Sequence, residues 1–330
     1  MAVLSVANPT LLDLAKVKDP DGNIAQLVEI LNATNEVMQD ISFIEGNLPT
    51  GHRSSIRAGL PTVTWRQLYG GVQPSKSRYA QVTDNAGMLE GYSEVDKALA
   101  DLNGDAAAFR FLEDRGFIES FSQEMTDTLF FGNEAVNPAR FTGLYPRFNS
   151  LQAENGENII EGGGTGTDNA SIWLVVWSPM TCHMFVPKGS NAGLQMRDLG
   201  EDTTTNADGS KFQIYRTHFR QDAGLTLRDW RYVVRIANID RSDLKSDAST
   251  GPDLPDLIHR AITQIPNLNM GRAVLYADRE IIGFLRRQVA RLTKESTLTM
   301  ENVGGTLQTQ FMGIPLRRCD ALSADEARVV

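Results

Sequence analysis

The sequence predicts a mixed α+β protein in which helices and strands are partly segregated along the chain. Two observations predict this class. Apolar residues recur at helical spacing in several segments, most clearly in 106–131. Other segments, such as "SIWLVVW" at 171–177, are continuous runs of β-branched and aromatic residues. With 330 residues, 41% of them apolar, the chain can bury a core in two packed subdomains or one elaborated domain.

Composition excludes several functional classes. Forty-one acidic residues against 32 basic ones give a net charge of −9, which argues against a dedicated nucleic-acid binder but permits a local basic surface. No run approaches the length of a membrane helix, and the N-terminus lacks the pattern of a signal peptide. The two cysteines, Cys182 and Cys319, form no CxxC motif, so we expect buried free thiols in a protein made in the cytoplasm.

The first element expected is a modest helix after Gly22, because Ile24, Leu27, Val28 and Leu31 form one apolar stripe. From residue 42 to about 83 the pattern changes to strands. Ile56, Val63 and Trp65 alternate with polar residues, and glycines and prolines mark turns. This pattern predicts a long two-stranded ribbon, which is marginal in water without further support.

The strongest helix is expected over 106–131, with Asp105 as its N-cap and a length of roughly 39 Å at about 1.5 Å per residue. A short helix, for which Ser93 can serve as the N-cap, precedes it. Five acidic residues are expected to make the exposed side of the long helix negative. They are Glu113, Asp114, Glu119, Glu124 and Asp127. Its apolar stripe comprises Phe109, Leu112, Phe121, Met125 and Leu129, with Phe117 and Ile118 filling the middle turn.

Loops rich in Gly, Asn and Pro are expected over 132–168, followed mainly by strands. The strand segments are "SIWLVVW", "TCHMFVP", "KFQIYRTHF" and "LTLRDWRYVVRIAN". Two amphipathic helices, "PDLPDLIHRAITQI" and "ADREIIGFLRRQVARL", come next, and a strand–turn–strand around Gly313 follows them.

Charge distribution singles out the ribbon. Residues 49–78 carry five basic side chains and no Asp or Glu, although the whole chain is acidic. Like charges on a thin ribbon repel one another, so the ribbon is expected to lie on an acidic surface, such as the long helix of a neighbouring copy. We therefore expect self-assembly, in which Trp65 and Tyr69 act as apolar anchors. The basic residues are Arg53, Arg57, Arg66, Lys76 and Arg78. A solvated surface hairpin is the alternative interpretation.

No segment predicts catalysis, a cofactor or a metal. "EGGGTGT" lacks the following helix and Lys of a phosphate loop, so a flexible loop is expected. Cys182 and His183 are adjacent in a strand and point to opposite faces, so they cannot form a nucleophile–base pair. The four histidines lack the spacing of metal ligands, and Glu113 with Asp114 suits a solvated helix face better than an acid–base pair.

The order of these elements resembles the major capsid proteins of tailed bacteriophages with the Hong Kong 97-type fold, especially podovirus-like members. Four segments carry the resemblance, which covers most of the chain. They are "GNLPTGHRSSIRAGLPTVTWRQLYGGVQPSKS", "GMLEGYSEVDKALADLNG", "TDNASIWLVVWSP…MFVPKGSNAGL" and "FMGIPLRRCDAL".

The resemblance implies an N-terminal arm region (1–41), an extended β-hairpin called the E-loop (42–85) and a peripheral domain (86–167) whose spine helix is 105–131. It also implies a mainly axial domain (168–290) and C-terminal strands (291–330). The "SIWLVVW" strand block comes earlier than in the family pattern, so the segment order is expected to be rearranged. Lys76 is the hairpin's only lysine, but no Asn acceptor or catalytic Glu is marked, so no Lys–Asn crosslink is expected.

The resemblance further implies hexamers and pentamers that form an icosahedral shell around double-stranded DNA, without sequence-specific DNA binding, as part of the virion. A separate scaffold protein, a portal and decoration or cement proteins are the implied partners. Two alternatives remain at this point. One is an encapsulin-like compartment of the same fold, and the other is a soluble α+β enzyme with an unrecognised site.

Overall fold

The computed structural model describes residues 36–102, 105–206, 208–246, 251–291, 298–303, 306–323 and 325–330. The helix expected around Ile24–Leu31 lies outside these ranges. The chain forms two compact units. Of the described residues, the first unit takes those within 88–125 and 191–222, and the second takes those within 36–87, 126–190 and 223–330.

The first unit is built from strands and the N-terminal part of a long helix. Its elements are β4 (Gly87–Asp96), α2 (Lys97–Asp101), α3 (Ala106–Phe131), β8 (Gln195–Thr205) and the first part of β9 (Lys211–Leu227). β8 and β9 pair antiparallel along almost their whole shared length. Phe117 and Phe121 of α3 pack on Phe219 of β9, with ring centroids 5.6 and 6.1 Å apart.

Helix α3 begins and ends where the sequence predicts, and Asp105 caps it by accepting a hydrogen bond from the Ala108 N–H at 3.0 Å. The prediction for the preceding helix is wrong at its start. Asp96, not Ser93, is the N-cap of α2 and accepts from the Ala98 N–H at 2.8 Å. Ser93 is buried within β4, because the polar residues between Gly87 and Asp96 continue a strand instead of opening a helix.

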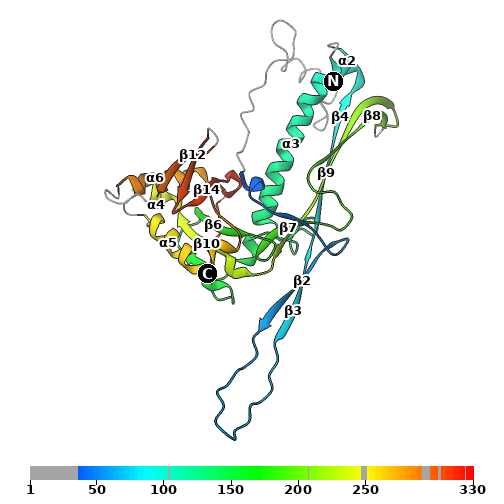
Figure 1. The fold of residues 1–330 in the computed structure, drawn as a ribbon. Coiled ribbons are helices and arrows are strands. Elements are labelled where there is room, and N and C mark those ends of the chain that lie inside the picture. The colour runs from blue at the N-terminus through cyan, green and yellow to red at the C-terminus, as the bar shows by residue number, and fades with distance from the viewer. Residues whose placement is uncertain are drawn as a thin grey trace. The chain divides into compact units, whose positions relative to one another are not determined.

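The second unit contains most of a large mixed sheet (Figure 1). Its centre is β6 (Asn169–Trp177), which is buried along its entire length and pairs antiparallel with β10 (Val233–Asp240) and β11 (Arg272–Ala277). Burial on both faces explains the continuous apolar run in its sequence. The remaining sheet strands of this unit are β1 (Phe43–Glu45), β5 (Ile159–Glu161), β7 (Cys182–Val186), β12 (Leu298–Val303), β13 (Thr306–Phe311) and β14 (Ile314–Arg318).

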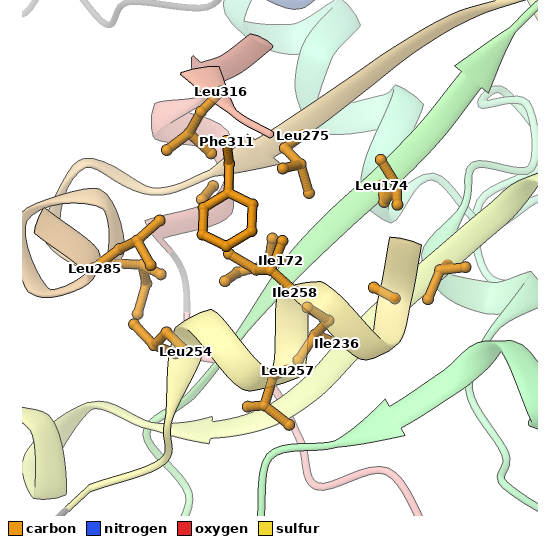
Figure 2. Packing of buried hydrophobic residues seen from close by; sticks show 14 of the residues in the cluster. Ile172, Leu174, Ile236, Leu254, Leu257, Ile258, Leu275, Leu285, Phe311 and Leu316 are labelled. Carbon is orange, nitrogen blue, oxygen red and sulfur yellow. The ribbon is translucent and has the colours of Figure 1, made fainter. Parts of the chain in front are cut away.

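Helices cover one face of this sheet and complete the core. α5 (Leu254–Gln264) is capped by Asp253, and α6 (Arg279–Arg291) packs beside it; the short α4 (Arg241–Ser246) follows β10. Leu257 and Ile258 of α5 and Leu285 of α6 meet side chains from several strands of the sheet (Figure 2). The strand partners labelled there are Ile172, Leu174, Ile236, Leu275, Phe311 and Leu316.

Several sequence expectations for this unit are confirmed and one is corrected. The two amphipathic helices and the strand–turn–strand around Gly313 are present. The segment expected as one strand over 225–238 is interrupted. β9 ends at Leu227, a short 3₁₀ turn covers Trp230–Tyr232, and β10 starts at Val233. Asp229 causes this break by accepting a hydrogen bond from the Arg231 N–H at 3.1 Å, which stabilises a turn.

Candidate assembly surface

A two-stranded hairpin leaves the second unit as the sequence predicts. β2 (Gly51–Gly59) and β3 (Arg78–Asn85) pair antiparallel as a sheet of their own. At their base, β1 pairs in parallel with β7, and the Gly46 N–H donates to the Val186 carbonyl at 2.7 Å. Beyond Gly59 the chain forms an irregular loop, residues 60–77, which extends away from the other elements of its unit (Figure 1). Val63 and Trp65 therefore lie in this loop and not in a strand.

The loop 60–77 exposes large apolar side chains that a folded monomer normally buries. Trp65 and Tyr69 are as exposed as residues in a fully extended chain, at 105% and 106% relative accessibility. Leu60, Val63, Leu68 and Val72 are also exposed. Such a concentration of exposed apolar area is typical of a protein–protein interaction site.

Tyr69 also has an unusual backbone conformation. Its φ is +66°, a region that bulky L-residues rarely adopt, and it stands in a turn in which the Gly70 N–H donates to the Gln67 carbonyl at 3.0 Å. A glycine or asparagine would suit this position better. The tyrosine ring makes no compensating contribution to the fold, because it is completely exposed.

The predicted basic residues lie along the same hairpin. Arg53, Arg66, Lys76 and Arg78 are exposed, and Arg57 stands in β2 opposite Tyr79. Arg53 is held by its own hairpin, since its Nε donates to the Thr83 hydroxyl at 3.2 Å. Within the described residues, Arg66, Lys76 and Arg78 meet no carboxylate, so their charges are available to another molecule.

The acidic face expected on α3 is only partly present. Asp114 is buried and lies 3.4 Å from the Thr217 hydroxyl, so it does not belong to an exposed face. Asp127 pairs with Arg140 at 3.0 Å, and Glu119 accepts a hydrogen bond from Gln123 at 2.9 Å. The four acids other than Asp114 are partly exposed, whereas the most open large side chains of the helix include Phe111 and Ile118. Phe117 and Ile118 were expected to fill the middle turn of the apolar stripe, and the exposure of Ile118 corrects that prediction.

The structure gives no support to a catalytic pair at Cys182 and His183. Both residues are buried in β7, and burial raises the pKa of the Cys182 thiol to about 12, which favours the protonated thiol at neutral pH. Burial likewise lowers the pKa of His183 to about 4. Among the described residues, no three His, Cys, Asp or Glu side chains are placed to hold a metal ion. None of the described helices combines the length and the apolar character needed to cross a membrane.

Sequence reasoning missed the buried polar groups of the second unit, two of which stand out. Arg235 has no exposed side-chain surface and lies in the middle of β10, where it pairs with Glu326 at 2.6 Å. A single arginine within the apolar run "YVVRIA" was a detectable signal. His52 and His183 form the other group, with ring centroids 5.7 Å apart. No sequence signal joined these two, because their contact depends on how β2 meets β7.

Comparison with known families identifies the chain. A family model described as major capsid protein GP7 matches residues 19–330. The chain belongs to the major capsid protein GP7 family. The resemblance noted in the sequence is thereby confirmed, and the protein is a bacteriophage capsid protein that forms the shell of the virion.

Solved structures agree with this assignment. The GP7-family chain is 36% identical to a chain in the structure of bacteriophage epsilon15, with a TM-score of 0.78 and complete coverage of both chains. The capsid of bacteriophage JBD30 is 9% identical, with a TM-score of 0.51 and coverage of 89% of this chain and 93% of that chain. At that identity the JBD30 match shows a shared fold alone, and the predicted Hong Kong 97-like class is confirmed.

The encapsulin alternative receives no support of the same kind. An encapsulin complex from Synechococcus elongatus is 9% identical with a TM-score of 0.44, covering 66% of this chain and 92% of that chain, which is too distant to bear on function. A search of curated proteins found no match.

Proposed function

We propose that the extended hairpin of one capsid protein copy lies on a neighbouring copy, and that this contact drives assembly of the shell. The observation that carries the proposal is Tyr69, whose side chain is entirely exposed on a backbone with φ of +66°. A monomer gains nothing from an aromatic residue in that position. A partner that covers Tyr69 and Trp65 gains binding energy from both side chains, because large aromatic side chains dominate the binding energy of protein interfaces.

Charge supports the same contact. Arg66, Lys76 and Arg78 project positive charge from a protein whose net charge is −9. Their partner surface on the neighbouring copy includes the partly exposed acids of α3, namely Glu113, Glu119, Glu124 and Asp127. Oppositely charged surfaces direct the approach and the orientation of the two copies more than they add affinity.

The assembled form that we propose consists of hexamers and pentamers closing into an icosahedral shell around double-stranded DNA. Each copy contributes an arm region (1–41), the E-loop (42–85), a peripheral domain (86–167), a mainly axial domain (168–290) and C-terminal strands (291–330). Separate scaffold and portal proteins, and decoration proteins, complete the particle. The protein acts structurally and not as an enzyme. The net negative charge of the chain limits non-specific binding of the packaged DNA to the inner surface of the shell.

The test is assembly of the purified full chain with Trp65→Ala and Tyr69→Gly introduced together. Circular dichroism should report an unchanged fold, since neither side chain contacts the body, while sedimentation and electron microscopy should show loss of closed particles. Val136→Ser is the matched control, because Val136 is 81% exposed in a loop outside the hairpin. Normal particles from the double variant would contradict the proposed contact. Particles isolated from cells that contain protein cargo instead of nuclease-protected DNA would contradict the proposed contents.

A further inference from the structure

Two histidines meet where the extended hairpin joins the second unit. His52 in β2 lies edge-on to His183 in β7, with ring centroids 5.7 Å apart and planes 79° apart. Phe185, also in β7, lies 5.6 Å from the His52 ring. His183 is 1% exposed and His52 is partly buried. These three rings form the contact between β2 and β7, and we refer to them as the hairpin seat.

The polar atoms of the hairpin seat lack partners to an unusual degree. Among the described residues, neither ring nitrogen of His183 nor Nδ1 of His52 makes a hydrogen bond. Buried polar groups in native proteins are nearly always satisfied, so such a cluster calls for an explanation. Neutral imidazole rings tolerate this apolar packing far better than charged rings do, because an unpaired buried charge is much more costly.

The charged groups around the seat act on the histidines in both directions. Asp84 stands opposite His52 in the β2–β3 register and favours a charge on that ring. One of its oxygens accepts a hydrogen bond from Arg147 at 2.9 Å, and among the described residues the other has no hydrogen-bond partner. Arg228, which follows β9, acts in the opposite direction and disfavours a charge on either ring. The Ser178 backbone near His183 favours the charged form, without reaching hydrogen-bond geometry. Burial is the largest cause and lowers the pKa of both histidines.

The backbone at the base of the hairpin is closely packed. A Cβ on Gly51 would lie 2.3 Å from the Asp84 carbonyl oxygen, and one on Gly224 would lie 2.4 Å from Cζ of Phe185. A Cβ on Gly46 would lie 2.9 Å from the Gly51 carbonyl oxygen.

We propose that His52 and His183 form a proton-sensitive latch that holds the base of the hairpin on β7 while both rings are neutral and releases it when either ring is protonated. The latch is a property of the folded chain and does not depend on assembly. When the seat opens, the hairpin separates from β7 while the core around β6 stays folded. Strand β6 itself contains no histidine.

The direction of the pH effect follows from linkage. His183 has a pKa of about 4 when the latch is closed, against 6.5 in water, so the open state binds more protons. The closed state is therefore most favoured above pH 6.5 and is lost progressively as the pH falls from 6.5 towards 4. Between pH 7.5 and pH 5.0 the opening equilibrium constant should rise by roughly 30-fold from His183 alone.

Hydrogen exchange of the purified, unassembled full chain tests the latch. The informative amides are those of Gly46 and Lys188, which donate to the Val186 and Leu48 carbonyls across the base of the hairpin. Their exchange is measured at pH 7.5 and 5.0, corrected for the chemical exchange rate, and compared with that of the core strand 169–177. We expect the opening constant of the hairpin base to increase by roughly 30-fold at pH 5.0 and to remain larger than that of β6 at both pH values, because the latch opens without unfolding the core. The variant His183→Phe fills the same space without a titratable group and should abolish the increase.

A second histidine variant serves as the control. His259→Phe removes a partly buried histidine of α5 that packs edge-on against Phe311 of β13, and it should leave the pH response intact. If His183→Phe fails to fold, His52→Phe serves as the second variant and should reduce the response. An equal pH response in wild type and His183→Phe would overturn the latch, as would simultaneous opening of β6 and the hairpin base.

Discussion

Arg235 and Glu326 form an ion pair of 2.6 Å in which the two side chains are 0% and 2% exposed, although 91 positions separate them in the sequence. The pair is surrounded by further polar partners. Arg235 also donates to the Phe148 carbonyl at 2.6 Å and to the Ser171 hydroxyl at 3.1 Å, and its guanidinium lies 4.2 Å from the centre of the Tyr145 ring. The pair thus joins the segment 325–330 to the centre of the sheet.

Glu326→Gln should destabilise the protein by about 3–5 kcal/mol, because it leaves the Arg235 charge buried without a counter-charge. Equilibrium urea unfolding followed by circular dichroism measures the loss. Glu161→Gln provides the comparison, since its pair with Arg328 spans 3.5 Å with both side chains 44% exposed, and it should change stability by less than about 1 kcal/mol. Similar losses in the two variants would contradict the importance assigned to burial.

Two glycines should respond to alanine with opposite signs. Gly224→Ala would place a Cβ 2.4 Å from Phe185 and 2.9 Å from the Asn85 carbonyl oxygen, and it should cost about 1–3 kcal/mol or more. Gly283→Ala, within α6, meets nothing within 4 Å and should stabilise the protein by about 0.5–1 kcal/mol through helix propensity. Thermal unfolding of both variants beside wild type checks the signs.

The thiols of Cys182 and Cys319 should not react in the folded protein. Both are buried, and burial raises the pKa of each to about 12. Titration with an aromatic disulfide reagent near pH 8 should therefore label neither thiol in native protein and both thiols in urea. Rapid labelling of the native chain at a rate independent of unfolding would show that one of the cysteines is accessible.

Tyr69→Gly alone should leave the stability of the unassembled chain unchanged or slightly increased. The substitution removes a side chain that touches nothing and relieves a left-handed backbone, for which glycine carries no steric cost. The measurement is the urea midpoint of unassembled protein. A clear loss of stability would mean that the ring packs within its own chain, which would also weaken the proposed assembly contact.

Local sequence patterns predicted the elements that depend on local chemistry. The start of α3 could be predicted because an aspartate N-cap followed by helix-forming residues is a local signal. Strand β6 could be predicted from its continuous apolar run. Ser93 was assigned wrongly because a serine before a helical pattern resembles a cap, while the pairing that holds β4 extended involves residues more than a hundred positions away. β8 was not predicted at all, because most of its residues are polar and exposed.

The candidate site was predictable in its charge and its exposure but not in its detail. The absence of acids from 49–78 indicated a ribbon that needs a partner, and the loop 60–77 is exposed as that argument requires. The acidic face of α3 was overstated, because helical spacing alone could not show that Asp114 turns towards Thr217. The His52–His183 contact depends on the meeting of two separate strand pairs, which no local pattern encodes.

The exposed loop 60–77 has a consequence for the life of each newly made chain. A free subunit exposes the apolar side chains of Trp65, Leu68 and Tyr69 to the other proteins around it. We therefore expect free subunits to aggregate or bind chaperones as their concentration rises. Prompt assembly of the shell then also protects the subunits from aggregation.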